Sequence, residues 1–198
     1  MSTLKVKRDT IDILFANARS QNGWLLEPVT DDQIAAAYEI AKWGPTSMNT
    51  QPLRCVCLRS PEAKERIRPA LNPGNVEKVI TAPVVAIFAY DLEFYTHLHR
   101  TFPHNKNAPN AFLGKDAHIQ GTAFRNGTLQ AAYMILALRA VGLDVGPMSG
   151  FNNAKVDAEF FPGSSYRSNF ICGIGHGDSG KLMGRLPRLE WHEISQTL

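Results

Sequence analysis

The stretch from residue 122 to residue 143, TAFRNGTLQAAYMILALRAVGL, constrains the fold of this chain more than any other segment. At helical spacing, four of its apolar side chains share one face: Leu129, Tyr133, Leu136 and Ala140. Further apolar side chains cover much of the remaining surface, so the helix must be buried on both sides, in a core or against a second subunit. The most apolar run within it, residues 129–143, is interrupted by Arg139 and is shorter than the roughly 20 residues that a membrane span needs. We therefore predict a long buried helix and no membrane association.

Other segments predict an α+β chain around this helix. Helices are expected over residues 4–18, 30–43, 61–70, 76–81 and 153–161, and strands over residues 53–58, 83–90 and 168–174. Thr30 and Gln33 match a capping box, and Gly44-Pro45 is a typical helix stop. Turns are expected at residues 72–75 and 146–150, and a long loop at residues 100–120. Because no repeat or linker is visible, we predict a single domain over residues 1–198.

The composition argues against several classes of protein. Basic residues number 21 against 18 acidic residues, and long basic runs are absent, so nucleic acid is not an expected partner. The three cysteines, Cys55, Cys57 and Cys172, are too few for a disulfide framework and favour a reducing compartment. Cys55 and Cys57 are expected to pack as small apolar residues. The first ten residues lack the apolar core of a signal peptide, so we expect a cytoplasmic protein.

Motifs for common catalytic chemistry are weak in this sequence. Residues 175–180 match G-x-G-x-x-G after a strand, but Gly184 and Pro187 would break the helix that a dinucleotide site requires. Ser149 does not stand in a nucleophile elbow. Four histidines fall between residues 97 and 118 without a metal-ligand spacing, so surface positions are favoured over a metal site.

Four polar segments remain after these motifs are set aside: residues 19–22, 45–51, 147–150 and 181–188. Each follows or closes a regular element and offers short hydrogen-bonding side chains and backbone N–H groups. Taken alone, each segment is more often an ordinary turn. Taken together, they are the mixture that a phosphorylated planar cofactor requires: arginine and serine for the phosphate, amides for ring heteroatoms, and glycine for close approach.

The sequences of these segments are specific in combination. They read ARSQNGW (18–24), KWGPTSMNTQPLR (42–54), GPMSGF (146–151) and GRLPRLE (184–190), and FRNGTLQAAYMILALRAVGLDVGPMSGF (124–151) and ERIRPALNPGN (65–75) add to them. From about residue 10 onward the chain resembles the FMN-dependent nitroreductase family, most closely its bacterial malonic semialdehyde reductase branch, which is associated with pyrimidine utilisation. The resemblance implies an α+β sandwich with a central, mostly antiparallel sheet flanked by helices. It also implies an intertwined homodimer whose two FMN sites lie at the subunit interface.

The resemblance assigns roles to residues of this chain. For the ribityl phosphate it points to Arg19, Ser20, Gln21 and Asn22, to Arg185, and to Lys181 or Arg188 as a further cation. The flavin would also contact Asn75 and a loop lent by the other subunit, with Pro45, Thr46, Ser47 and Asn49. Beneath the ring would lie the turn of Pro147, Met148, Ser149 and Gly150, with a backbone N–H of Ser149 or Gly150 directed at flavin N5. Three positions depart from the common family pattern, which has arginine, a basic residue and glutamate where this chain has Ala18, Met183 and Ser149.

The activity implied by the resemblance is a ping-pong hydride transfer from NADH or NADPH through FMN N5 to a small-molecule substrate. It requires no catalytic side chain and no metal. The resemblance favours reduction of malonic semialdehyde to 3-hydroxypropionate, with the substrate carboxylate held by Arg125, Lys106, Lys115 or His104. Two alternatives stay open: a broad-specificity nitroaromatic or quinone reductase with the same site, and a flavin-binding protein without turnover.

Overall fold

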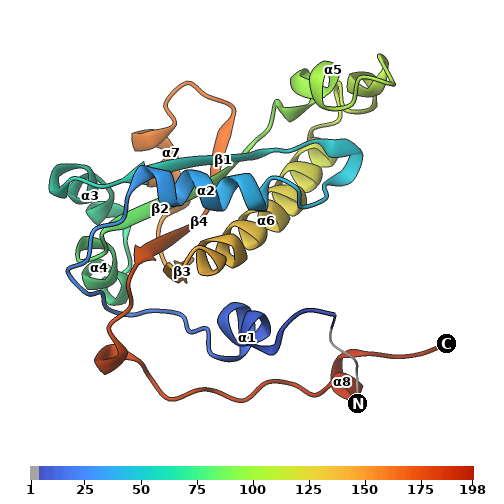
Figure 1. The fold of residues 1–198 in the computed structure, drawn as a ribbon. Coiled ribbons are helices and arrows are strands. Elements are labelled where there is room, and N and C mark those ends of the chain that lie inside the picture. The colour runs from blue at the N-terminus through green and yellow to red at the C-terminus, as the bar shows by residue number, and fades with distance from the viewer. Residues whose placement is uncertain (1–4) are drawn as a thin grey trace.

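The computed structural model describes residues 5–198, and a four-stranded antiparallel sheet lies at its centre. The strands are β1 (Leu53–Leu58), β2 (Val84–Asp91), β3 (Asp144–Met148) and β4 (Tyr166–Gly175), in the order β1-β2-β4-β3. Figure 1 shows helices on both sides of this sheet. The structure thus confirms the predicted α+β fold with an antiparallel sheet flanked by helices.

Strand β2 forms the centre of the core, because all eight of its residues are buried. Its side chains alternate between two clusters, with Val84, Ala86 and Phe88 on one face of the sheet and Val85, Ile87 and Ala89 on the other. A strand that is covered on both faces needs a continuous apolar run. The run at residues 83–90 therefore predicted this strand correctly, and β1 and β4 also lie where the sequence predicts strands.

Helices α2 (Asp31–Ala41) and α6 (Asp116–Ala140) cover one face of the sheet. Thr30 is the N-cap of α2, where its Oγ1 accepts a hydrogen bond from the Gln33 N–H and Gln33 Oε1 accepts one from the Thr30 N–H. This capping box confirms the predicted start of the helix. The start predicted for α6 at residue 122 is wrong, because the helix begins at Asp116, whose carboxylate stabilises the positive first turn.

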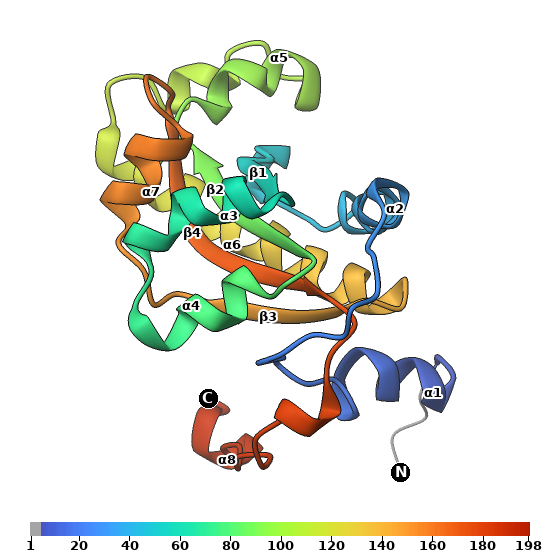
Figure 2. The same ribbon diagram turned by 90° about the vertical axis from the view of Figure 1, so that its left-hand side faces the viewer.

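Helices α3 (Pro61–Ile67), α4 (Pro73–Ile80) and α7 (Asn153–Phe160) cover the opposite face, together with the 3-10 turn η3 (Arg68–Ala70). Figure 2 shows these helices across the sheet from α2. The turn predicted at residues 72–75 is wrong, since Pro73 takes the first helical position of α4, where a missing N–H is tolerated. The cap predicted at Asn153 is displaced by one residue, because the Asn152 side chain accepts the hydrogen bond from the Lys155 N–H.

Strand β3 replaces much of the turn predicted at residues 146–150. Its register pairs Pro147 with Cys172 and Met148 with Ile171 of β4. A proline is tolerated here because β3 is an edge strand, with one side that needs no N–H donor. The turn proper therefore begins only at Ser149.

Residues 94–115 form a compact lobe instead of the long loop predicted over residues 100–120. The lobe contains the short turns η4 (Phe94–His97), α5 (Leu98–Thr101) and η5 (Ala108–Ala111). Phe94, Leu98 and Phe112 are almost fully buried in a cluster of their own. The prediction failed here because short turns bring apolar residues together without a helical or strand period.

The two terminal segments lie together below the sheet in Figure 1, and Figure 2 shows the same pairing. The first contains α1 (Arg8–Ile11) and the π-helical turn η1 (Asp12–Ala16), and the second contains η6 (Ser179–Lys181) and α8 (Trp191–Ile194). The helix predicted from Leu4 is thus found from Arg8 onward, and Leu4 itself lies outside the described residues. Within residues 5–198, no helix combines the length and apolarity needed to cross a bilayer.

Helix α6 is buried against the sheet on one side and carries an exposed apolar stripe on the other. Leu129 and Tyr133, four residues apart on one face, are 45% and 38% exposed, whereas Ala131 and Leu138 are fully buried. The burial predicted for both sides of this helix is therefore met on the sheet side only. Exposed apolar stripes of this kind are typical of interaction surfaces.

Candidate functional site

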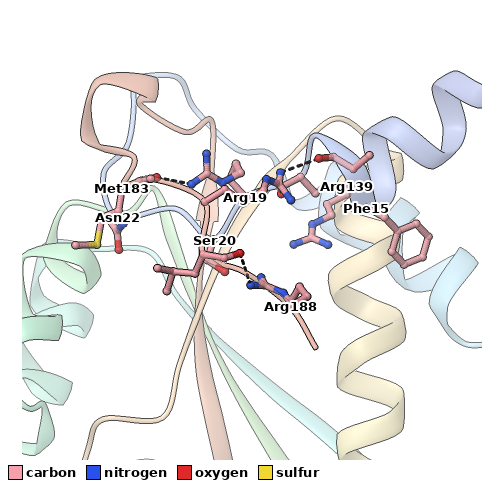
Figure 3. Close-up of a pocket in the computed structure, with 12 residues that line it drawn as sticks. Phe15, Arg19, Ser20, Asn22, Arg139, Met183 and Arg188 are labelled. Carbon is pink, nitrogen blue, oxygen red and sulfur yellow. Dashed lines mark hydrogen bonds between the residues drawn. The ribbon is translucent and has the colours of Figure 1, made fainter. Parts of the chain in front are cut away.

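A cavity of about 650 Å³ lies where the two terminal segments meet the end of α6. Its lining comes from residues 15–22, from the last turn of α6 and from residues 183–188. Figure 3 shows Arg19, Ser20, Asn22, Arg139 and Arg188 around this space. Arg185 also belongs to the lining, and we call this space the arginine cavity.

The arginine cavity is strongly basic, because four arginines line it and no Asp or Glu is among its described lining residues. The guanidinium groups donate to backbone carbonyl oxygens: Arg139 to Leu14 at 2.9 Å, Arg185 to Ala16 at 2.7 Å, Arg188 to Leu186 at 3.0 Å, and Arg19 to Met183. Carbonyl groups orient these cations without neutralising them, so their charge is available to an anionic ligand. Burial lowers the pKa of Arg139, but a guanidinium remains protonated near neutral pH.

Residues 19–24 are fixed against the edge of the sheet. Ser20 forms a parallel bridge with Val145 of β3, and the Gln21 N–H donates to the Val145 oxygen at 3.0 Å. The Trp24 indole N–H donates to the Lys78 oxygen at 3.0 Å, and the ring covers Gly173. A Cβ at residue 173 would lie 2.5 Å from that ring, so glycine is required for this approach. These contacts hold Arg19 and Ser20 at the cavity.

Two residues of the predicted phosphate site lie outside the arginine cavity. The Gln21 side chain is buried, packs against Gly177, and leaves its Oε1 atom without a hydrogen-bond partner in the described part of the chain. Lys181 Nζ donates to Glu77 Oε1 at 3.0 Å, and this contact raises the pKa of Lys181. The structure therefore brings Arg19, Ser20, Asn22 and Arg185 together and leaves these two apart.

The turn after β3 supplies backbone donors at a second position. Asn75 Nδ2 and the Asn72 N–H both donate to the Gly150 oxygen at 3.0 Å, and a Cβ on Gly150 would lie 2.6 Å from the Asn75 amide. The N–H groups of Ser149 and Gly150 donate to no other group among residues 5–198. Val145 touches the first segment, and Gly150 lies at most roughly 17 Å farther along the chain at 3.3 Å per residue. Edge strand β3, with Pro147 and Met148, thus connects the arginine cavity to the two available N–H groups of Ser149 and Gly150.

The loop at residues 45–51 is tightly constrained. It contains the 3-10 turn η2 (Ser47–Asn49), and Met48, Asn49 and Gln51 have φ angles of 51°, 50° and 44°. Such angles are uncommon for residues other than glycine and persist only where surrounding contacts impose them. The main such contact is the Ser47 N–H, which donates to Oδ1 of the buried Asn126 on α6 at 2.8 Å.

Most side-chain groups of this loop bind other parts of the same chain. Thr46 Oγ1 accepts from the Gln51 N–H at 3.3 Å, and Asn49 Nδ2 donates to the Thr101 oxygen at 2.7 Å. Ser47 is exposed, and its hydroxyl has no partner within residues 5–198. Pro45 is exposed beside it. Ser47 is therefore the side chain best placed to reach a ligand outside its own chain.

The loop and the arginine cavity lie at opposite ends of α6. The loop is anchored at residue 126, and the cavity is lined by Arg139. At 1.5 Å per residue these positions are separated by roughly 20 Å along the helix axis. Figure 1 shows the same separation between the loop after α2 and the segment around α1. A single chain therefore does not bring Pro45, Thr46, Ser47 and Asn49 to the arginine cavity.

Sequence reasoning did not find two of the residues that line the cavity. Arg139 was visible as the charged residue that interrupts an apolar helix, which is a usable signal for a functional side chain. Phe15 gave no such signal, because its exposed ring reads as part of an ordinary amphipathic helix. The tail was expected to supply Arg185 with Lys181 or Arg188 as a further cation, and of these Arg185 and Arg188 line the cavity.

Other candidate motifs have ordinary surroundings. The segment at residues 175–180 leads into a 3-10 turn rather than a helix, as expected, and the Gly177 N–H donates to Asp144 Oδ2 at 2.9 Å. The His104 ring lies tilted against Phe102, and His118 stacks on Phe112. Residues 5–198 contain no cluster of His, Cys, Asp or Glu suited to a metal ion. The packing expected of Cys55 and Cys57 is wrong, because both are exposed, with their sulfur atoms 3.8 Å apart.

The residues expected to hold a substrate carboxylate are scattered. Arg125, Lys106, Lys115 and His104 are all exposed, and none of them lines the arginine cavity. Lys115 Nζ donates to the Ala111 oxygen at 3.1 Å within its own turn. The geometry gives no common destination for these four side chains.

The fold is an α+β sandwich with a basic cavity at one end of an edge strand and open N–H groups at the other, an arrangement suited to an extended, anionic ligand. Comparison with known proteins makes the class specific. The model of the nitroreductase family matches residues 17–176. This chain belongs to the nitroreductase family.

Relatives of known sequence and structure agree with this assignment. A protein of Cupriavidus pinatubonensis, provisionally named an NADH dehydrogenase/NAD(P)H nitroreductase, is 53% identical over 190 residues, which are 95% of this chain and 97% of that protein. The protein HadB of Ralstonia pickettii carries the same provisional description. It is 56% identical over 182 residues, which are 91% of this chain and 93% of that protein. Neither name is that of a malonic semialdehyde reductase, so the narrower branch suggested by the sequence motifs is not shown.

A solved structure supports the fold. A provisionally named nitroreductase of Exiguobacterium sibiricum, crystallised in complex with FMN, superposes with a TM-score of 0.85 at 18% sequence identity. The match covers 99% of this chain and 100% of that chain. The shared architecture therefore extends over both terminal segments as well as the sheet.

Proposed function

We propose that this protein is an FMN-dependent NAD(P)H oxidoreductase that acts as a homodimer. The observation that carries the proposal is the arginine cavity, whose four cations face no carboxylate, at one end of edge strand β3. FMN has a phosphate to fill such a cavity and a planar ring that accepts hydrogen bonds. The names of the two bacterial relatives and the FMN bound to the Exiguobacterium protein support the same cofactor class and reductant.

The residues present fit this cofactor. Arg19, Ser20 and Arg185 would hold the phosphate, with Arg139 supplying further positive charge at the buried end of the cavity. Asn75 and the N–H groups of Ser149 and Gly150 would hydrogen-bond to the ring. Bound FMN would supply a carrier for two electrons, taking a hydride from NADH or NADPH and passing it on in a ping-pong cycle. The protein's own part is to position the reactants and exclude water.

The homodimer is proposed from two features of the single chain. Leu129 and Tyr133 leave an apolar stripe on the outer side of α6. The loop at residues 45–51 holds a rigid shape and presents an exposed Ser47, roughly 20 Å along α6 from the cavity. Two chains packed through their α6 helices would bury the stripe and bring the loop of each to the cavity of the other. Such an interface would be large and apolar, as in obligate dimers.

The oxidant that accepts the electrons is one of two kinds. The sequence resemblance favours malonic semialdehyde, reduced to 3-hydroxypropionate. The relatives' names favour a nitro compound, and the broad-specificity alternative adds a quinone. Steady-state rates with all three oxidants, each with NADH and with NADPH, separate the candidates, since kcat/KM ranks substrates by transition-state binding.

The cofactor proposal is tested by purification and anaerobic reduction. We expect a yellow dimer that takes up FMN and whose visible absorbance is bleached when NADH or NADPH is added without oxygen. A colourless protein that binds no FMN at micromolar concentration would refute the cofactor. A yellow protein whose flavin is bleached by neither nucleotide would instead support a flavin-binding protein without turnover.

A further inference from the structure

A second cavity, of about 290 Å³, lies beside the loop at residues 45–51 and apart from the arginine cavity. Thr50, Arg54, His97, Arg100 and Gln130 are among its lining residues, and we call it the Arg100 pocket. The loop is tied to the same lobe, because Asn49 Nδ2 donates to the oxygen of Thr101, which also lines the pocket. A ligand in this pocket would therefore lie next to the loop.

Arg54 is a fixed part of the pocket wall. Its Nη2 atom lies 2.5 Å from Asp91 Oδ2, and its Nη1 atom donates to the Leu53 oxygen at 2.8 Å. Asp91 is 3% exposed, and its other oxygen accepts hydrogen bonds from Ser165 Oγ at 2.6 Å and the Glu93 N–H at 2.8 Å. Asp91 Oδ2 also lies 3.9 Å from Nε2 of His97, a second residue of the pocket wall. Among residues 5–198 Asp91 forms no ion pair with Arg100, so it does not neutralise that arginine.

The remaining polar groups of the pocket are mostly donors without partners. Arg100 is exposed and forms no ion pair within residues 5–198. Gln130 Oε1 accepts from the Leu53 N–H at 3.0 Å, so its amide nitrogen is left as a donor. The Thr50 side chain is 1% exposed, and its hydroxyl has no hydrogen-bond partner in the described structure. No Asp or Glu is among the described lining residues. An unpaired arginine with neighbouring donors is the arrangement that binds a carboxylate.

We propose that the Arg100 pocket binds the carboxylate of an acidic substrate and that Arg100 determines this specificity. The inference rests on the proposed function, because the loop beside the pocket is the one that would reach the flavin of the second copy. A short acid held at Arg100 would place its reducible carbon next to that loop. Arg100 on α5 thus takes the place of the four exposed residues between 104 and 125 as the cation for the substrate carboxylate. The reason is that the pocket brings further hydrogen-bond donors close to Arg100.

The kinetic test compares Arg100→Gln with Arg68→Gln in the FMN-loaded dimer. Arg68 is an exposed arginine on the opposite face of the sheet, so its substitution is a matched charge control. For malonic semialdehyde, we expect Arg100→Gln to raise KM about 10- to 150-fold, the loss typical of a hydrogen bond to a charged group. For a neutral quinone, KM and kcat should stay near the wild-type values. Equal effects on the two oxidants, or no effect on either, would overturn the assignment.

An equilibrium measurement separates this proposal from the proposed function. Malonate and inorganic phosphate are each titrated calorimetrically into wild type, Arg100→Gln and Arg68→Gln. Binding of malonate that is weakened only in Arg100→Gln supports the pocket even if the wild-type protein reduces no oxidant. Equal malonate affinity in all three proteins refutes it. Phosphate binding that is tighter than malonate binding and is weakened only in Arg100→Gln would refute a carboxylate in this pocket and indicate a nucleotide phosphate instead.

Discussion

The arginine cavity and the loop at residues 45–51 stand at opposite ends of α6 and are built in opposite ways. The cavity collects long, charged side chains from three distant parts of the chain and holds them with backbone carbonyl groups. The loop is a single short segment of small polar residues, held in left-handed conformations by a buried asparagine. The cavity is formed by one chain, whereas the loop is held in place by its own chain and presents the exposed Ser47 outward. The difference indicates that one part grips a ligand and the other is presented to a neighbouring molecule.

The largest change is expected for mixed dimers, which test whether the cavity and the loop of one site come from different chains. One chain carries Arg19→Ala with Arg185→Ala, and the other carries Ser47→Trp. Because Ser47 is exposed, the larger side chain should block contact between the loop and the flavin without disturbing the core of its own chain. If each site takes its cavity from one chain and its loop from the other, a purified mixed dimer has one intact site, so about half of the wild-type FMN should bind. The measurement is flavin absorbance per chain after gel filtration.

The matched controls are the two homodimers, which should bind little FMN. A mixed dimer that binds no more FMN than its parents would show that each site belongs to a single chain, and the division of roles between cavity and loop would be wrong.

The second effect concerns the cavity alone. Arg185→Ala removes a guanidinium that faces no carboxylate in the lining, so FMN affinity should fall about 10- to 150-fold, as expected for a charge-assisted contact. Fluorescence titration of the apoprotein with FMN measures this change. Lys181→Ala is the control, because Lys181 pairs with Glu77 outside the cavity. An equal loss in both variants would mean that overall charge, and not the cavity, attracts the phosphate.

The third effect concerns the loop alone. Asn126→Ala leaves the Ser47 N–H without its acceptor and removes a buried side chain, so the free energy of unfolding should fall by about 1–3 kcal/mol. Urea denaturation measures this change. Hydrogen exchange at residues 45–51 should accelerate, while exchange at residues 19–24 should stay near that of the wild type. Faster exchange in both segments would show that the two ends of α6 are not independent.

The smallest effect tests the core beneath both regions. Burial raises the pKa of the Cys172 thiol to about 12, above its ordinary value of 9.0. The folded state therefore favours the neutral thiol, and this contribution is fully present below pH 9 and is lost as pH rises toward 12. Above pH 9, stability should fall more steeply in wild type than in Cys172→Ala, by at most about 1.4 kcal/mol per pH unit. Parallel stability curves from denaturant melts would show that Cys172 is not shielded.

Much of the fold could be predicted because its signals are local. The apolar run at residues 83–90 can bury both faces of a strand, and the capping box at Thr30 and Gln33 acts within one turn of helix. The edge strand at residues 144–148 was missed, because glycine and proline there give the local signal of a turn. Its strand conformation depends on the hydrogen bonds that β4 supplies.

The candidate site divides in the same way. The amino-acid sequence alone was enough to predict which segments bind a ligand, because arginine, serine and short amide side chains occur in four polar turns that match one family. It also indicated that the helix at residues 122–143 needs burial on both sides, in a core or against a second subunit. Only the tertiary structure decided the destinations: Arg139 lines the cavity, Lys181 pairs with Glu77, and Arg100 rather than residues 104–125 faces a donor-rich pocket. The physical reason is that composition fixes which groups can bind a ligand, whereas their convergence depends on contacts between residues far apart in the chain.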